Sequence, residues 1–126
     1  MRKVEIIPAT LDLITEFEGQ PPELTQKTLA VRENNETIAL TGILLNQSRW
    51  ILFSHIHPDI QKDLRKYKRE VILASRKVLE MVKNQPLPVY AKAQEGVDGS
   101  DRLLIHLGFV HIERGLYKWQ PQHPIS

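Results

Sequence analysis

Two histidines and a serine near the middle of the chain could take part in proton transfer. Ser54 and His55 belong to the run Trp50–Ile56, whose other residues are apolar and which predicts a buried strand; His57 follows it directly. Side chains two positions apart point to one face of a strand, so His55 and His57 share a face. An imidazole titrates near neutral pH. His55 is therefore either a general base or an ordinary histidine at a buried or edge position.

These histidines could also bind a metal ion, but the residues around them do not support this. No carboxylate or third ligand stands at a suggestive spacing beside them. The chain has no cysteine, which excludes disulfides, thiolate catalysis and thiolate zinc sites. The sequence therefore predicts no metal site.

Positive charge gathers in one part of the chain. The net charge is +2, but residues 59–83 hold eight Lys or Arg and four Asp or Glu, whereas the rest holds nine basic and eleven acidic residues. This indicates either one contact site for an anion, such as a phosphate-bearing ligand, or a solvated helix face. The aromatic residues, apart from Tyr67, are not interleaved with the cations, which argues against a nucleic-acid partner.

A mixed set of strands and helices must position these residues. Apolar periodicity, helix caps, glycines and prolines predict the order β-α-β-β-β-α-β-α-β-β, over residues 3–7, 11–18, 28–33, 37–44, 50–56, 59–83, 89–93, 101–107, 109–113 and 116–119. One mixed α/β domain is expected over residues 1–119, with a loose tail over 120–126. No apolar run is long enough to span a membrane and the N-terminus has no apolar signal core, so a cytoplasmic protein is expected.

The long helix over 59–83 is amphipathic. Its apolar residues recur every three or four positions, which predicts one face packed on the sheet and one face in solvent. The residues expected inside are Leu64, Val71, Val78 and Val82, and those expected outside are Lys62, Arg69, Arg76 and Lys83. The expected strands over 28–33 and 37–44 form a hairpin. Asn34-Asn35-Glu36 is its turn sequence, and Gly42 in the second strand indicates a bulge or close packing.

Two segments stand out beside the order of elements: Ile56-His57-Pro58-Asp59-Ile60-Gln61, and Ser100 to Phe109 with its Leu-Gly-Phe turn, followed by the closing segment Gly115 to Trp119. With these segments and one long helix after the fourth strand, the chain resembles the GNAT superfamily of acetyl-CoA-dependent N-acetyltransferases. The resemblance covers roughly residues 3–119 and is strongest to small GNAT-like proteins of tailed phages. It implies a mixed, mostly antiparallel sheet in which the strand over 89–93 pairs parallel to the strand over 50–56.

The resemblance also implies a site. The backbone of the fourth strand, at Phe53 and Ile56, holds the pantetheine arm of acetyl-CoA, and Gln61 opens the loop for the pyrophosphate. The family's loop glycines are replaced by Leu64 and Lys66, or by Lys66 and Lys68 in the other register. Cationic side chains would then contact the phosphates in place of the missing glycines. These cations are Arg65, Lys66, Lys68 and Arg69.

At the catalytic positions that the resemblance implies, this sequence departs from the residue types of the family. Leu104 takes the place of the family's acid, a tyrosine, and the fourth strand has Ser54 and His55 in place of a glutamate. Tyr117 could reach a ligand cleft from the last hairpin. The expected function is acetyl transfer from acetyl-CoA to an unknown amine; the alternative is a catalytically silent, GNAT-like protein that binds a partner or associates with a virion.

Overall fold

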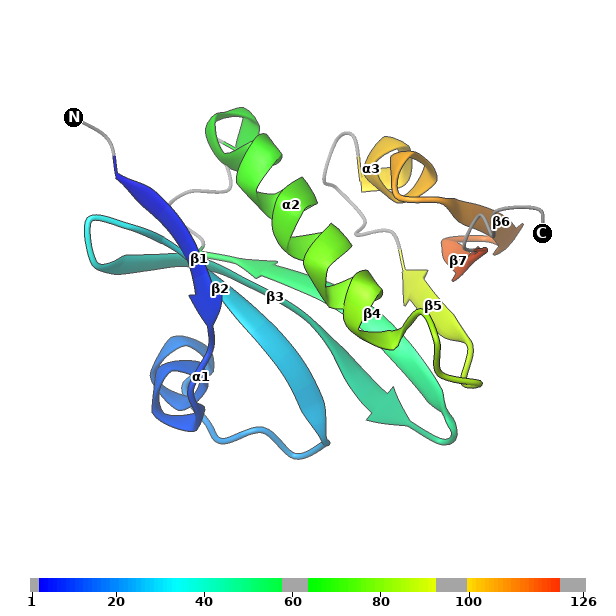
Figure 1. Cartoon of the computed structure of the whole chain (residues 1–126), viewed down its shortest axis with the longest axis horizontal. Coiled ribbons are helices and arrows are strands. Elements are labelled where there is room, and N and C mark those ends of the chain that lie inside the picture. Colours follow the sequence, from blue (N-terminus) through cyan, green and yellow to red (C-terminus); the bar gives the residue numbers. More distant parts are fainter. Residues whose placement is uncertain (1–2, 58–63, 93–99, 121–126) are drawn as a thin grey trace.

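The computed structural model describes residues 3–57, 64–92 and 100–120 (Figure 1). In the second range the side chains are described from Lys66 onward, and in the third range from Arg102 onward. The predicted order of elements is confirmed. The elements are β1 (Val4–Pro8), α1 (Leu11–Glu18), β2 (Gln26–Glu33), β3 (Glu36–Asn46), β4 (Arg49–Ile56), α2 (Leu64–Val82), β5 (Val89–Lys92), α3 (Ser100–His106), β6 (Phe109–Glu113) and β7 (Leu116–Trp119).

The strands form one seven-stranded sheet in the order β1-β2-β3-β4-β5-β7-β6. All neighbouring strands are antiparallel except β4 and β5, which are parallel. The predicted parallel pair is therefore confirmed, and α2 is the connection that parallel strands require.

Two tight turns set the register of the central strands. Asn34 and Asn35 have φ angles of 51° and 69°, and Gln47 and Ser48 have φ angles of 50° and 64°. Two successive residues with positive φ are typical of a turn whose twist matches that of paired strands, and asparagine tolerates this conformation. The first turn fits the prediction for residues 34–36, and the second connects β3 to β4.

The two faces of the sheet carry different helices. On one face, α2 and α3 cover the main core, which contains Leu52, Ala91, Leu104 and Tyr117. On the other face, α1 packs through Ile14 over Ala30 and Leu40, in a smaller cluster. Among the described residues, no helix is long and apolar enough to cross a membrane.

The phase of α2 is the predicted one. Val71, Val78 and Val82 are buried, whereas Arg69, Arg76 and Lys83 are exposed. The helix ends at Val82, one residue before the predicted end. Lys62, the side chain of Leu64 and the tail after residue 120 lie outside the described part of the chain.

Candidate functional site

In the described residues, the parallel pairing of β4 with β5 covers the first half of β4. The register runs from Trp50↔Val89 to Leu52↔Ala91, although β4 continues to Ile56. On its other side, β4 stays paired with β3 as far as Ile56↔Ala39. Among the described residues, no strand pairs with β4 beyond Leu52 on the side of β5, and this stretch is called the open edge of β4 below.

The direction of the backbone shows which groups line this open edge. The N–H of Trp50 donates to the Pro88 carbonyl at 2.8 Å, on the β5 side, whereas the N–H of His57 donates to the Ile38 carbonyl at 2.8 Å, on the β3 side. Because successive N–H groups in a strand point to opposite edges, those of Ser54 and Ile56 point to the open edge. The N–H of Ile56 thus points to this edge and that of Phe53 points to β3; the role of either residue in holding the pantetheine arm stays a prediction.

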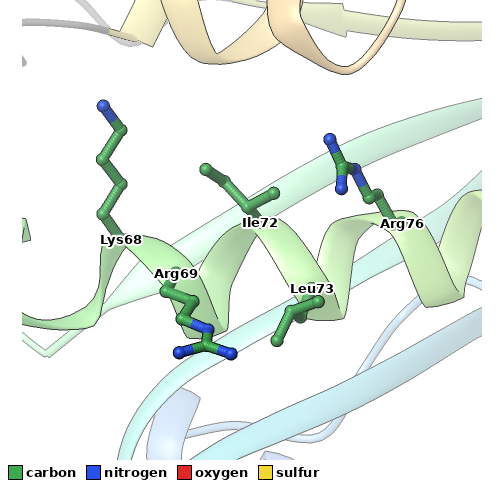
Figure 2. Close-up of a pocket in the computed structure, with 5 residues that line it drawn as sticks. All are labelled: Lys68, Arg69, Ile72, Leu73 and Arg76. Atoms are coloured by element: carbon green, nitrogen blue, oxygen red, sulfur yellow. The ribbon is translucent and has the colours of Figure 1, made fainter.

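A basic flank of α2 lies beside α3. Lys68, Ile72 and Arg76 point to the side of the helix on which α3 lies, and with Arg69 and Leu73 they line a shallow depression (Figure 2). A guanidinium nitrogen of Arg76 is 2.9 Å from Nε2 of His106, at the end of α3. Lys68 and Arg69 are exposed and have no ion-pair partner among the described residues. Figure 2 shows that the two side chains extend to different sides of α2, and only Lys68 extends to the side of α3.

Lys66 differs from the neighbouring cations. Its Nζ lies 3.9 Å from Oε1 of Glu33 in β2 and 5.4 Å from the centroid of the Tyr67 ring. The Tyr67 hydroxyl donates a hydrogen bond to the same carboxylate. Lys66 thus already neutralises a charge within the protein. Of the other predicted phosphate contacts, Gln61 and the side chain of Arg65 lie outside the described residues.

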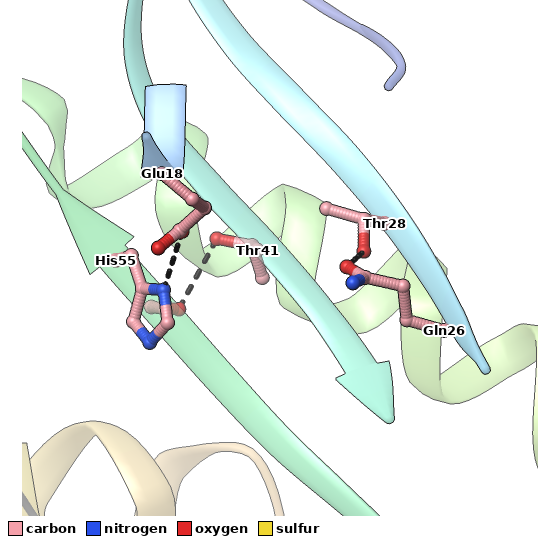
Figure 3. A network of polar contacts seen from close by, with 6 residues as sticks. Glu18, Gln26, Thr28, Thr41 and His55 are labelled. Carbon is pink, nitrogen blue, oxygen red and sulfur yellow. Dashed lines mark hydrogen bonds and ion pairs between the residues drawn. The ribbon is translucent and has the colours of Figure 1, made fainter. Parts of the chain in front are cut away.

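His55 is paired with an acidic residue far away in the sequence. Its Nδ1 lies 2.6 Å from Oε1 of Glu18, the last residue of α1, and the two side chains are 48% and 30% exposed (Figure 3). The His55 ring also stacks at a tilt on Phe53, with 4.9 Å between ring centroids. His57 contacts Phe17 of α1 edge to face, at 6.3 Å. His55 is thus an exposed, oriented imidazole.

The three predicted catalytic side chains do not converge on one point. His55 is opposite Leu40 and lies on the α1 face of the sheet. Ser54 lies on the α2 face, where its hydroxyl is 3.1 Å from that of Thr41. Tyr117, opposite Ala91, is 6% exposed and belongs to the main core, as does Leu104. Only His55 combines an exposed titratable group with a fixed orientation.

Sequence reasoning did not find Glu18. The α1 helix was predicted with its correct bounds, but no local pattern shows that its last residue reaches β4, 37 positions later. In the described residues, no group of three or more His, Cys, Asp or Glu side chains could hold a metal ion.

No protein-family model matches the chain, and no curated protein matches its sequence. Several solved structures are similar, among them the following three. A chain of the KacTA–DNA complex has a TM-score of 0.57 and 11% identity, covering 93% of this chain and 92% of that chain. The ribosomal-protein-S18-alanine N-acetyltransferase from Escherichia coli has a TM-score of 0.50 and 15% identity, covering 90% and 80%. The putative N-acetyltransferase YhhK from E. coli, bound to coenzyme A, has a TM-score of 0.49 and 17% identity, covering 94% and 99%.

The first two likenesses show the fold. The seven-stranded mixed sheet, with its parallel pair joined through the long helix, is the GNAT fold of N-acetyltransferases, as the sequence predicted. The particular likeness to phage proteins stays a prediction.

Proposed function

We propose that this protein binds acetyl-CoA at the open edge of β4 and transfers the acetyl group to an amine. Two observations carry the proposal: in the described part of the chain the β4–β5 pairing ends at Leu52, and the N–H groups of Ser54 and Ile56 point away from β3. An amide-bearing chain such as the pantetheine arm can complete this edge by hydrogen bonding. Such contacts need no particular side chain.

The phosphates of acetyl-CoA would meet cationic side chains. Lys68 and Arg69 lie near the start of α2 and are exposed, and charge-assisted hydrogen bonds to phosphate are strong. Lys66 is a weaker candidate because it is paired with Glu33. The glycine-free sequence around this helix start therefore favours recognition by side chains. One solved structure of the same fold is an N-acetyltransferase, which supports the proposed reaction class.

Calorimetry and NMR together test the proposal. Acetyl-CoA and free CoA are titrated into the purified protein at low salt, and amide spectra are recorded during the same titration. We expect saturable binding in which the Ser54 and Ile56 amide signals shift more than those of Ile51 and Phe53, whose N–H groups point to β3. Release of free thiol is then followed with a panel of amines.

Absence of binding at millimolar acetyl-CoA and low salt would contradict the proposal. The protein would then be the alternative, a GNAT-shaped module that binds a protein or virion partner. If acetyl-CoA binds but no amine is acetylated, the binding half of the proposal stands. The first residue to examine would then be Leu104, whose buried side chain cannot donate a proton.

A further inference from the structure

The contact between Glu18 and His55 joins two elements on the α1 face of the sheet. Oε1 of Glu18 lies 2.6 Å from Nδ1 of His55, a short hydrogen-bond distance. A carboxylate can only accept, so the bond requires a proton on Nδ1. In the neutral ring the other nitrogen, Nε2, then carries the lone pair.

We propose that Glu18 is a positioning residue that holds neutral His55 in the Nδ1–H tautomer, so that Nε2 accepts the proton of the acceptor amine. This inference rests on the proposed acetyl transfer. The roles are distinct: His55 would contact the substrate, and Glu18 would act only through His55.

The place of His55 in β4 suits this role. Its two neighbours, Ser54 and Ile56, direct their backbone groups to the open edge where the thioester of the donor is proposed to lie. The His55 side chain projects to the α1 face, so the acceptor would approach from that side while the donor lies along the edge. The Phe53 ring, 4.9 Å away, limits the ring positions that His55 can take.

The proton and the electrons balance in the transfer step. The acceptor enters as an ammonium and gives one proton to Nε2. The nitrogen lone pair forms the new bond to the acetyl carbon, the bond from this carbon to sulfur breaks, and the electron pair leaves with sulfur as the CoA thiolate. The thiolate takes a proton from water, and the amide nitrogen and His55 return their excess protons to solvent.

The tautomer can be measured without any ligand. Long-range ¹H–¹⁵N spectra of the ¹⁵N-labelled protein distinguish the two neutral forms of the ring. They are recorded at rising pH until the histidine signals no longer change, and loss of a signal in His55→Gln assigns it. We expect the Nδ1–H form in the wild type and in Glu18→Gln, whose side-chain oxygen still accepts, and a mixture in Glu18→Ala. An Nε2–H wild type, or a Glu18→Ala protein with the wild-type pattern, would overturn the proposal.

Acetyl-transfer kinetics supply the second measurement. We expect kcat to fall about a hundred-fold or more in His55→Gln and about ten-fold in Glu18→Ala, with KM for acetyl-CoA unchanged, because general bases contribute roughly 10²–10⁴-fold. Glu18→Gln should retain more activity than Glu18→Ala. The control is Glu16→Ala, which removes an exposed glutamate from the same helix and should leave kcat unchanged.

The two measurements separate the two proposals. A wild-type kcat in Glu18→Ala would overturn the role of Glu18 even if transfer occurs. If no amine is acetylated, the transfer half of the proposed function fails, and the tautomer spectra still decide whether Glu18 positions His55. Glu18→Ala and Glu18→Gln should both fold, because a solvent-exposed ion pair contributes little to stability.

Discussion

At Gly42, β2 lies too close to β3 to leave room for a side chain. A Cβ atom at this position would lie 2.5 Å from the Lys27 carbonyl oxygen, 2.6 Å from Oγ1 of Thr28 and 2.9 Å from its Cα. Two of these atoms belong to the backbone and cannot move without displacing β2. We therefore expect Gly42→Ala to lower the free energy of unfolding by about 3 kcal/mol, at the upper end of overpacking effects, in a urea unfolding experiment.

A second glycine serves as the control. Gly115 has a φ of +73°, and nothing lies within 4 Å of a Cβ added there. Because asparagine tolerates positive φ, Gly115→Asn should change stability by less than about 1 kcal/mol. Equal losses in the two variants would show that close approach of β2 is not the reason for glycine at position 42.

At the scale of elements, the amphipathic pattern of α2 makes its orientation testable. Val71 is 3% exposed and lies against the sheet, whereas Leu73 is 39% exposed on the outer face. Val71→Asp would remove core contacts and bury a carboxylate, so we expect it to lower the free energy of unfolding by about 4 kcal/mol. Leu73→Asp places the same charge in solvent beside basic residues and should cost less than about 1 kcal/mol. Thermal unfolding of both proteins measures the difference, and similar melting temperatures would contradict this orientation.

Local signals explain which element bounds could be predicted. The α1 helix begins after Thr10, whose side chain accepts from the Leu13 N–H, and ends at Gly19, which has a φ of 82°. Both signals are visible in the sequence. The β2 strand instead begins at Gln26, two residues before the predicted start, because cross-strand pairing of Gln26 with Leu44 extends the ladder into polar residues. Pairing with a distant strand has no local signal.

At the scale of the whole molecule, the fold was more predictable than the site. The order of strands and helices and the parallel β4–β5 pair followed from periodicity and the resemblance. Whether the predicted site residues lie close together depends on which face of the sheet each side chain occupies and on contacts between elements that are distant in the sequence. Ser54 and His55 are adjacent in the sequence and lie on opposite faces, and the partner of His55 comes from α1. A one-dimensional pattern identifies such residues but not their partners.

The uneven charge of the molecule leads to a prediction about ligand affinity. Residues 59–83 carry eight of the chain's 17 basic residues, and Lys68 is among those that point to the side of α2 facing α3 (Figure 2). If Lys68 contacts a phosphate of CoA directly, Lys68→Ala should weaken binding about ten-fold, or about 1.4 kcal/mol.

Because exposed charges are screened over about 8 Å at 0.15 M salt, CoA affinity should also fall between low salt and that concentration, and less steeply in Lys68→Ala. Calorimetric titrations at both salt concentrations measure this, with Lys77→Ala as the control because Lys77 is exposed on α2 and does not line the depression. An equal loss in the two variants would mean that only the overall charge of the helix attracts CoA, whereas a loss confined to Lys68→Ala would place a phosphate on the flank beside α3.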